Sequence, residues 1–190
     1  ADDATALSKI ILWFRYNTKT NIGKKIKAGI CLVPGDATLE GLIPKLTIQE
    51  NILLSNRDKF TKFGGFRGSK VRSFCQKLIS LLDIRPNNPS TVVEYLSGGN
   101  RQKVVIAKWL AVGAKLMVMD DPTKGVDVGA KIEIYSVIGD ILSKGNSVIL
   151  GSTDLDELLG ISDRIIVIRD GNLASEFFTQ GFSTRRYEKL

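Results

Sequence analysis

Apolar segments short enough to be strands alternate with segments of helical periodicity from residue 100 onward. The expected order is helix 100–112, strand 116–119, helix 130–142, strand 147–150, helix 155–159 and strand 164–168. A helix that joins one strand to the next makes a crossover connection, and such connections build a parallel sheet. Because these strands are almost wholly apolar, we expect helices to cover both faces of the sheet.

Two further strands frame this alternation. Residues 30–33 are apolar, and Pro34 and Gly35 end them in what we expect to be a loop across the sheet edge. Residues 170–172 read Asp-Gly-Asn, which predicts a tight hairpin turn. Residues 173–177 are therefore expected to pair back antiparallel on the preceding strand.

The segment between the first strand and the alternation is predicted to be a helical insert over about residues 46–95. Thr47 and Glu50 have the spacing of a capping box, and residues 71–82 repeat apolar positions at a helical period. We therefore expect one α/β domain over residues 29–190 that contains this helical subdomain.

The chain contains no histidine. This absence excludes nucleophiles activated by histidine and every metal site that uses a histidine ligand. The two cysteines, Cys31 and Cys75, lie far apart in sequence, so we expect buried thiols and no disulfide framework or zinc site. Any chemistry must depend on carboxylates, backbone amides, hydroxyls, lysine or arginine.

The net charge of +7 is spread along the chain. It suits nucleic acid, nucleotide phosphates or an acidic membrane surface, and it selects none of them. Apolar runs such as residues 10–14 and 148–150 are far shorter than the roughly 20 residues of a membrane helix. The N-terminus shows no ordered succession of basic, apolar and small residues as in a secretory signal, so we expect a cytosolic setting.

The turn Leu96-Ser97-Gly98-Gly99-Asn100 stands directly before an expected helix. The two glycines allow a close approach to the backbone, Ser97 offers a hydroxyl, and the amides of a helix N-terminus favour negative charge. The turn therefore suits a phosphate group. An ordinary Ser-Gly-Gly turn that caps a helix would show the same residues.

The strand 116–119 is followed by Asp120 and Asp121. Carboxylates at the carboxyl end of a parallel strand lie in the crevice where α/β sheets bind ligands. A lone aspartate at this place can hold Mg²⁺ through water. Solvated carboxylates in a turn are the alternative interpretation.

Taken together and in this order, the two motifs resemble the signature motif and the Walker B strand of ABC ATPases, which have a P-loop NTPase-like fold. Residues 125–128 resemble the D-loop of that family, and residues 150–154 fall where it places its switch strand. The resemblance covers residues 29–177 and leaves residues 1–28 unassigned. Within the family, the chain is most similar to the C-terminal nucleotide-binding half of monosaccharide importers of the ribose, galactose and xylose type. The segments that carry this similarity are GICLVPGD, EGLIPKLTIQENILL, GGNRQKVVIAKWLA and LGISDRIIVIRDGNL.

The Walker A motif of that family, G-x-x-x-x-G-K-[ST], is missing from the sequence. Around Gly23 and Lys24, Thr18 stands where the first glycine is required and Lys25 where the hydroxyl is required. Gly23 also lies too close to the strand 30–33 to leave room for the helix of a P-loop. The resemblance therefore implies a domain whose N-terminal part is truncated.

Three other positions depart from the family pattern. Asp121 replaces the glutamate of efficient family members, which weakens general-base catalysis because the carboxylate is one methylene shorter. Thr153 replaces the switch histidine, and Thr153 can donate a hydrogen bond but cannot carry positive charge. Gly35 stands at the glutamine-loop position.

The resemblance implies an asymmetric pair of ATP sites. The residues expected to bind ATP across a head-to-tail pair, from the signature motif and the D-loop, are Ser97, Gly98, Gly99, Asn100 and Asp127. On this chain's own side, Asp120 would hold Mg²⁺ through water, Asp121 would take the weakened general-base position, and Thr153 would take the switch position.

The expected function is ATP hydrolysis coupled to sugar import, by a protein peripheral on the cytoplasmic face of the membrane. Its expected partners are a second nucleotide-binding half, a permease and, indirectly, a sugar-binding protein, and the isolated chain should be nearly inactive. A degenerate, non-catalytic binding and dimerisation module is the alternative. A nucleic-acid-associated ABC ATPase fits less well, and we expect no nucleic acid partner, because no basic stripe is interleaved with aromatic residues.

Other prominent side chains are expected to have structural roles. The aromatic residues that we expect to pack in the core or at an interface are Trp13, Phe14 and Trp109. The lysines that we expect on a solvated face are Lys103, Lys108 and Lys115.

Overall fold

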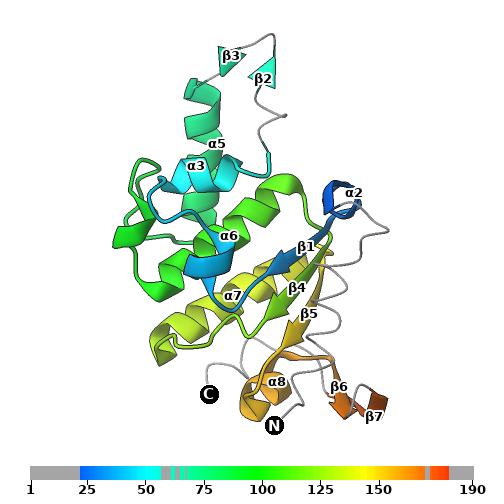
Figure 1. Ribbon diagram of the computed structural model, residues 1–190. Coiled ribbons are helices and arrows are strands. Elements are labelled where there is room, and N and C mark those ends of the chain that lie inside the picture. The colour runs from blue at the N-terminus through cyan, green and yellow to red at the C-terminus, as the bar shows by residue number, and fades with distance from the viewer. Residues whose placement is uncertain (1–21, 57–60, 63–64, 67, 170–171, 180–190) are drawn as a thin grey trace.

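The structure is a computed structural model that describes residues 22–56, 61–62, 65–66, 68–169 and 172–179 (Figure 1). The unassigned segment 1–28 therefore falls largely outside the described residues, apart from the helix α2 (Ile22–Lys27) and the turn that follows it. Trp13 and Phe14 lie in the part that is not described.

A three-stranded parallel sheet forms the centre of the molecule, in the order β1-β4-β5 (Figure 1). Its strands are β1 (Ile30–Val33), β4 (Leu116–Asp120) and β5 (Ser147–Gly151). The helices α6 (Gly98–Val112) and α7 (Val128–Ser143) make the crossovers around β4. The predicted strands 30–33, 116–119 and 147–150, the two long helices and the parallel pairing of these strands are confirmed.

The C-terminal strands form a separate antiparallel pair. After the short helix α8 (Leu155–Ile161), β6 (Arg164–Arg169) pairs with β7 (Asn172–Phe178), as the hairpin prediction requires. The turn residues 170–171 lie outside the described part. Within the described residues β6 has no partner in the parallel sheet, so the expectation that strand 164–168 continues that sheet is wrong. The hairpin with β7 forms instead, since a tight turn closes a much shorter loop than a crossover does.

The insert between β1 and α6 is less uniformly helical than predicted. Its elements are η1 (Ala37–Gly41), α3 (Ile48–Leu53), β2 (Thr61–Lys62), β3 (Gly65–Phe66), α5 (Gly68–Leu81) and η2 (Val93–Tyr95). The predicted capping box at the start of α3 is present: the Glu50 N–H donates to Thr47 Oγ1 at 3.3 Å, and the Thr47 N–H donates to Glu50 Oε2 at 2.8 Å. The small antiparallel pair β2-β3 was not predicted.

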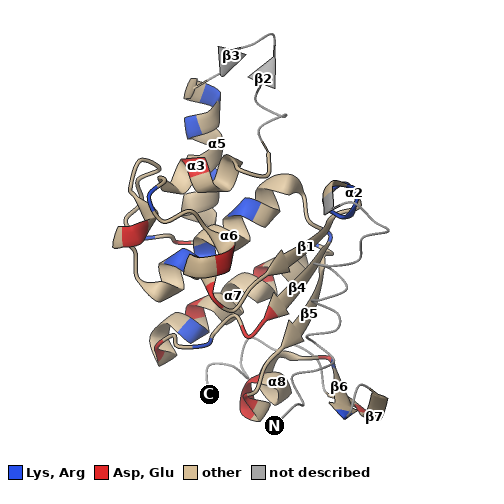
Figure 2. Ribbon diagram, viewed as in Figure 1, with Lys and Arg blue, Asp and Glu red and all other residues tan. Residues whose placement is uncertain are grey.

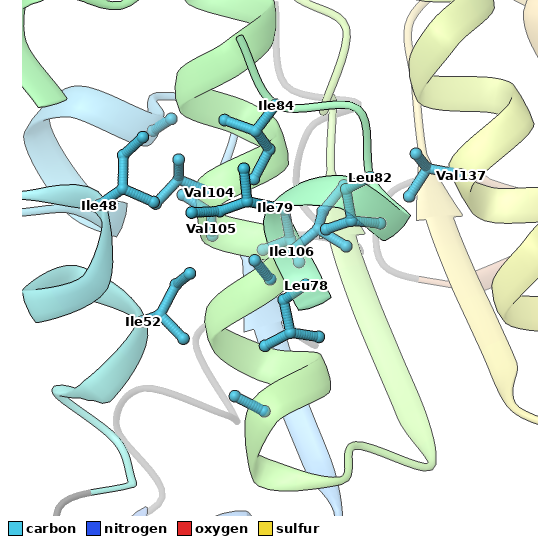
Figure 3. Packing of buried hydrophobic residues seen from close by; sticks show 14 of the residues in the cluster. Ile48, Ile52, Leu78, Ile79, Leu82, Ile84, Val104, Val105, Ile106 and Val137 are labelled. Carbon is cyan, nitrogen blue, oxygen red and sulfur yellow. The ribbon is translucent and has the colours of Figure 1, made fainter. Parts of the chain in front are cut away.

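One continuous hydrophobic core joins the insert to the sheet (Figure 3). Ile48 and Ile52 of α3 and Ile79 of α5 belong to the same cluster as Val105 of α6 and Met117 of β4. The described long helices pack on this one face. The opposite face of the sheet has only a small cluster of Ile30, Leu32 and Val118, and Ile149 of β5 is 39% exposed. Within the described residues, the expectation that helices cover both faces is therefore wrong.

The two cysteines are buried free thiols, as predicted. Burial raises the pKa of Cys31 to about 12 and that of Cys75 to about 11, so both remain protonated at neutral pH. Trp109 packs against the core, again as expected. Among the described helices, none is long and apolar enough to span a membrane.

Candidate functional site

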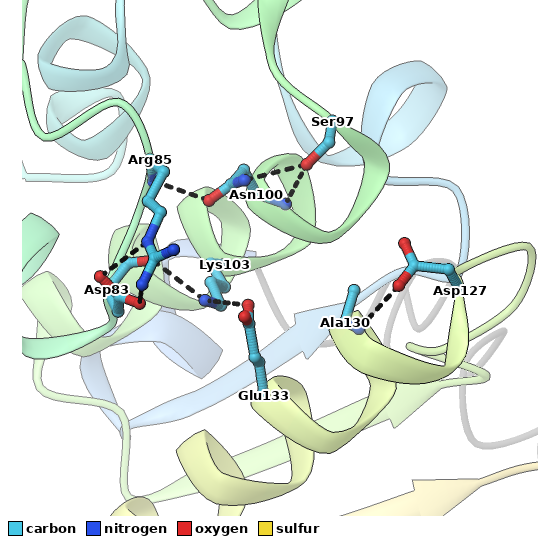
Figure 4. A network of polar contacts seen from close by, with 8 residues as sticks. All are labelled: Asp83, Arg85, Ser97, Asn100, Lys103, Asp127, Ala130 and Glu133. Atoms are coloured by element: carbon cyan, nitrogen blue, oxygen red, sulfur yellow. Dashed lines mark hydrogen bonds and ion pairs between the residues drawn. The ribbon is translucent and has the colours of Figure 1, made fainter.

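The serine of the turn before α6 caps that helix. Ser97 Oγ accepts hydrogen bonds from the backbone N–H and from Nδ2 of Asn100, at 3.4 and 2.9 Å, and Asn100 Oδ1 accepts from the Arg85 N–H at 2.7 Å (Figure 4). In both contacts with Asn100 the serine oxygen is the acceptor, so the hydroxyl proton is left to donate. Capping and anion binding are therefore compatible roles for Ser97, and Asn100 holds the turn in place.

The two glycines of this turn meet different surroundings. A Cβ added at Gly98 would meet nothing within 4 Å, so this backbone is open to a ligand. A Cβ added at Gly99 would lie 2.8 Å from the Cβ of Ala130 on α7. Gly99 is therefore required by the close packing of two helices, whereas Gly98 leaves the backbone accessible.

The start of α7 lies beside this turn. Asp127 caps α7 by accepting a hydrogen bond from the Ala130 N–H at 2.9 Å (Figure 4). A Cβ added at Gly99 would also lie 3.7 Å from a methyl group of Val126. The structure thus brings the predicted signature and D-loop residues together on two neighbouring helix N-termini. Both ends present unpaired backbone N–H groups, which favour a bound anion.

A second group of predicted residues lies at the carboxyl ends of β4 and β5. Asp120 is in register with Gly151, and the Asp121 N–H donates to the Gly151 oxygen at 2.7 Å. The backbone of Asp121 has a φ of 48°, an unusual conformation for a residue other than glycine and one that is common at functional sites. Thr153 follows β5 and is exposed.

The loop after β1 crosses this end of the sheet, as predicted. A Cβ at Gly35 would lie 2.7 Å from the backbone oxygen of Asp120, so only glycine allows this approach. Asp36 then caps the turn η1 by accepting from the Thr38 and Leu39 N–H groups at 2.9 and 2.8 Å.

The surroundings of Asp121 make its carboxyl group more basic than an exposed aspartate. Burial raises its pKa, and the nearby Glu157 and Asp120 raise it further, against the opposing effect of Lys124 and Lys131. A raised pKa strengthens a carboxylate as a proton acceptor. At the general-base position that we expect Asp121 to occupy, this effect would partly offset the weakening expected from its shorter side chain.

Sequence reasoning did not identify Glu157, which is only 1% exposed. Its Oε1 accepts a hydrogen bond from Thr123 Oγ1 at 2.9 Å, and its Oε2 accepts from the Ser152 hydroxyl. Asp154 and Glu157 have the spacing of a helix start, and Asp154 does cap α8. That spacing could have located the helix but not the burial of the carboxyl group.

Two lysines expected on a solvated face are buried, which corrects that prediction. Lys103 is 2% exposed and its Nζ lies 2.7 Å from Glu133 Oε2 and 3.0 Å from the Asp83 oxygen (Figure 4). Lys108 is 8% exposed, and its Nζ donates to the Gly41 oxygen at 2.6 Å. Lys115 is exposed as expected. The burial arises because α6 packs between α3, α5 and α7, which leaves it little solvated surface.

Charged side chains are not gathered in one basic stripe. Figure 2 shows lysine and arginine residues distributed over α2, α5, α6 and α7, and acidic residues in the loop after β4. Among the described residues, no three histidine, cysteine or acidic side chains cluster as a metal site. A single carboxylate such as Asp120 still fits Mg²⁺, which commonly takes one or two protein carboxylates and completes its shell with water and phosphate oxygens.

A family model described as ABC transporter matches residues 7–124. The ribose import ATP-binding protein of Bacillus subtilis is 39% identical over 170 residues, which are 90% of this chain and 34% of that protein. The xylose import ATP-binding protein of Pseudomonas fluorescens is 41% identical over 161 residues, which are 85% of this chain and 31% of that protein. The chain thus spans about a third of the length of these curated relatives.

Solved structures show the same arrangement of elements. A nucleotide-free ATP-binding cassette from an ABC transporter aligns with a TM-score of 0.74 at 21% identity, over 92% of this chain and 76% of that one. A dimeric, post-hydrolysis ATP-binding cassette bound to ADP and Pi aligns with a TM-score of 0.68 at 23% identity, over 87% of this chain and 70% of that one. At these identities the likeness concerns the fold.

Proposed function

The chain belongs to the ABC transporter family, and from this premise we propose that it is part of the ATP-binding subunit of a sugar importer. The family match and the cassette structures confirm the expected ABC-type α/β fold. The assignment to sugar import is supported by the relatives, which are named ribose and xylose import ATP-binding proteins.

The proposed reaction is the attack of water on the γ-phosphate of ATP, which releases ADP and phosphate. Ser97 and Gly98 would donate hydrogen bonds to the γ-phosphate of an ATP held by the partner half, and Asp127 would hold the adjacent helix start in place. On this chain's own side, Asp121 would accept a proton from water. Asp120 would hold Mg²⁺ through water, and the ion would neutralise charge on the phosphates.

The two sides are proposed to be unequal. The signature turn has an available hydroxyl and an open backbone, whereas the strand-end group combines Asp121 with Thr153 and has no Walker A sequence beside it. The hydrolytically competent site would therefore be the one completed by Ser97. The site framed by Asp120, Asp121 and Thr153 would hydrolyse slowly.

The proposed partners are a second nucleotide-binding half, arranged head to tail, and a permease, with a sugar-binding protein acting through the permease. The protein would lie on the inner face of the membrane. The helical subdomain, at about residues 46–95, together with the turn η1 would form the permease side, which is supported by the exposure of Leu39 and Ile43 at 83% and 46%.

The observation that carries the proposal is the pair of helix N-termini at Ser97 and Asp127. Its test uses the protein that contains this chain together with its partner nucleotide-binding half, assayed for MgATP hydrolysis. Ser97→Arg fills the open turn with a bulky cation and should lower kcat at least tenfold, whereas Thr153→Ala should change it less than threefold. Loss of turnover in Thr153→Ala with a harmless Ser97→Arg would refute the asymmetry.

A non-catalytic binding and dimerisation module is a second candidate, favoured by the absence of a Walker A sequence and by Asp121 and Thr153 at the catalytic positions. This candidate predicts that both variants in the same assay leave turnover unchanged, because all hydrolysis would occur elsewhere in the assembly. It also predicts that Ser97→Arg weakens association of the two halves.

A further inference from the structure

The side chain of Glu157 lies in the interior at the start of α8, between two loops. Burial of a carboxyl group is costly unless its oxygens are hydrogen-bonded. Here each oxygen has its own hydroxyl donor, Thr123 on one side and Ser152 on the other. Within the described part of the chain Glu157 makes no ion pair, so these hydroxyls, the side chain of Tyr135 and the N-terminus of α8 are its observed stabilising contacts.

The two donors belong to different loops. Thr123 is 1% exposed and lies in the loop after β4, two residues beyond Asp121. Ser152 follows β5 directly before Thr153. A backbone hydrogen bond from Asp121 to Gly151 extends the pairing of these strands. Beyond it, the side chain of Glu157 connects the two loops.

We propose that Glu157 is a positioning residue that ties the loop after β4 to the loop after β5 and thereby fixes Asp121 relative to Thr153. The statement that these loops face a γ-phosphate rests on the proposed function, whereas the tie itself rests on the geometry. In this role Glu157 does not contact the reacting groups itself. It acts on the two loops through the hydroxyls of Thr123 and Ser152.

Tyr135 of α7 also lies against Glu157, and burial together with this neighbour raises the pKa of the tyrosine.

The tie can be tested by amide hydrogen exchange on the full chain without nucleotide. Thr123→Val removes the hydroxyl on the β4 side while keeping the volume of the side chain. It should speed exchange at residues 152–154, on the other loop, at least fivefold. In Glu157→Leu these amides should already exchange fast, and adding Thr123→Val should change them less than twofold. The amides of β4 at 117–119 report global unfolding and separate it from local opening.

The proposal is overturned if Thr123→Val leaves exchange at residues 152–154 unchanged, or if it speeds exchange equally in the Glu157→Leu background. None of these measurements uses ATP. They therefore judge Glu157 even if the comparison of Ser97→Arg with Thr153→Ala refutes the proposed function.

Discussion

The two glycines of the signature turn differ in whether the structure has room for a side chain at their position. Gly99→Ala would place a methyl group 2.8 Å from the Ala130 Cβ and force α6 away from α7. Overpacking of this kind costs about 1–3 kcal/mol, against a gain of up to about 1 kcal/mol in helix propensity. We expect the free energy of unfolding in urea to fall by about 1 kcal/mol.

The neighbouring glycine is the matched control for this prediction. Gly98→Ala adds the same methyl group where nothing lies within 4 Å, so stability should change by less than about 0.5 kcal/mol or rise. Equal stability of the two variants would show that α6 and α7 do not pack as closely as the structure places them.

The burial of Lys108 predicts that the stability of the folded chain depends on pH. Burial lowers its pKa from 10.5 to about 8, while a lysine in the unfolded chain keeps the higher value. Below pH 8 both states are protonated and the full cost of burying the charge is present. Between about pH 8 and 10.5 the unfolded state binds more protons, so raising the pH through this window favours the folded state.

The expected gain is up to roughly 3 kcal/mol, at about 1.4 kcal/mol for each pKa unit. The measurement is urea unfolding at pH 7.5 and pH 10, compared with Lys108→Met, in which this site does not titrate. The Cys31 thiol, with its pKa of about 12, stays neutral over this range. A stability difference between wild type and Lys108→Met that is the same at both pH values would contradict the prediction, and Lys115→Met controls for loss of an exposed lysine.

At the scale of elements, α6 connects the segments around it through long polar side chains. Gln102 Nε2 donates to the Pro34 oxygen at 3.2 Å, and Arg101 donates to Thr38 Oγ1 at 3.1 Å. With Lys108 and Gly41, these contacts hold the whole segment from Pro34 to Gly41 against the helix that begins at the signature turn. A movement of that segment would therefore be transmitted to α6.

Lys103 makes the corresponding connection from α6 to α7 and to the end of the insert. Lys103→Met should lower the free energy of unfolding by about 1–3 kcal/mol, because the Asp83 carbonyl and the Glu133 carboxylate both lose their donor. Glu133 is 49% exposed and can regain water, which keeps the loss moderate. Lys77→Met, on an exposed position of α5, should cost less than about 0.5 kcal/mol in the same urea titration, and an equal loss in both variants would refute a specific role for Lys103.

The elements themselves were largely predictable from the sequence, because apolar periodicity and caps are local signals. Examples are the Thr47 capping box and the apolar strand 116–119. The burial of Lys103 and Glu157 was not predictable, since it depends on which helices surround a position. The hairpin of β6 and β7 was predictable from its turn residues, but its separation from the central sheet was not, because that depends on the tertiary structure. At the candidate site, the residue types were evident in the sequence, but the tie between the two loops was not.

At the scale of the whole molecule, the signature turn and the strand-end aspartates are each only part of an ATP site. This leads to a prediction about nucleotide binding. The sequence provides a signature turn and a strand-end aspartate but no Walker A lysine or glycine-rich loop to hold the phosphates. The isolated chain should therefore bind MgATP with a Kd weaker than about 1 mM, corresponding to less than about 4 kcal/mol. Isothermal titration calorimetry on the full chain measures this directly.

The control is the assembly with the partner half, in which Ser97 and Gly98 can complete an ATP site. Affinity should rise there into a measurable range, and Ser97→Arg should lower it again, because the added side chain occupies the open turn. Micromolar binding by the isolated chain would contradict the prediction. It would mean that Asp120, Asp121 and Thr153, together with residues outside the described part, form a nucleotide site that does not require a Walker A sequence.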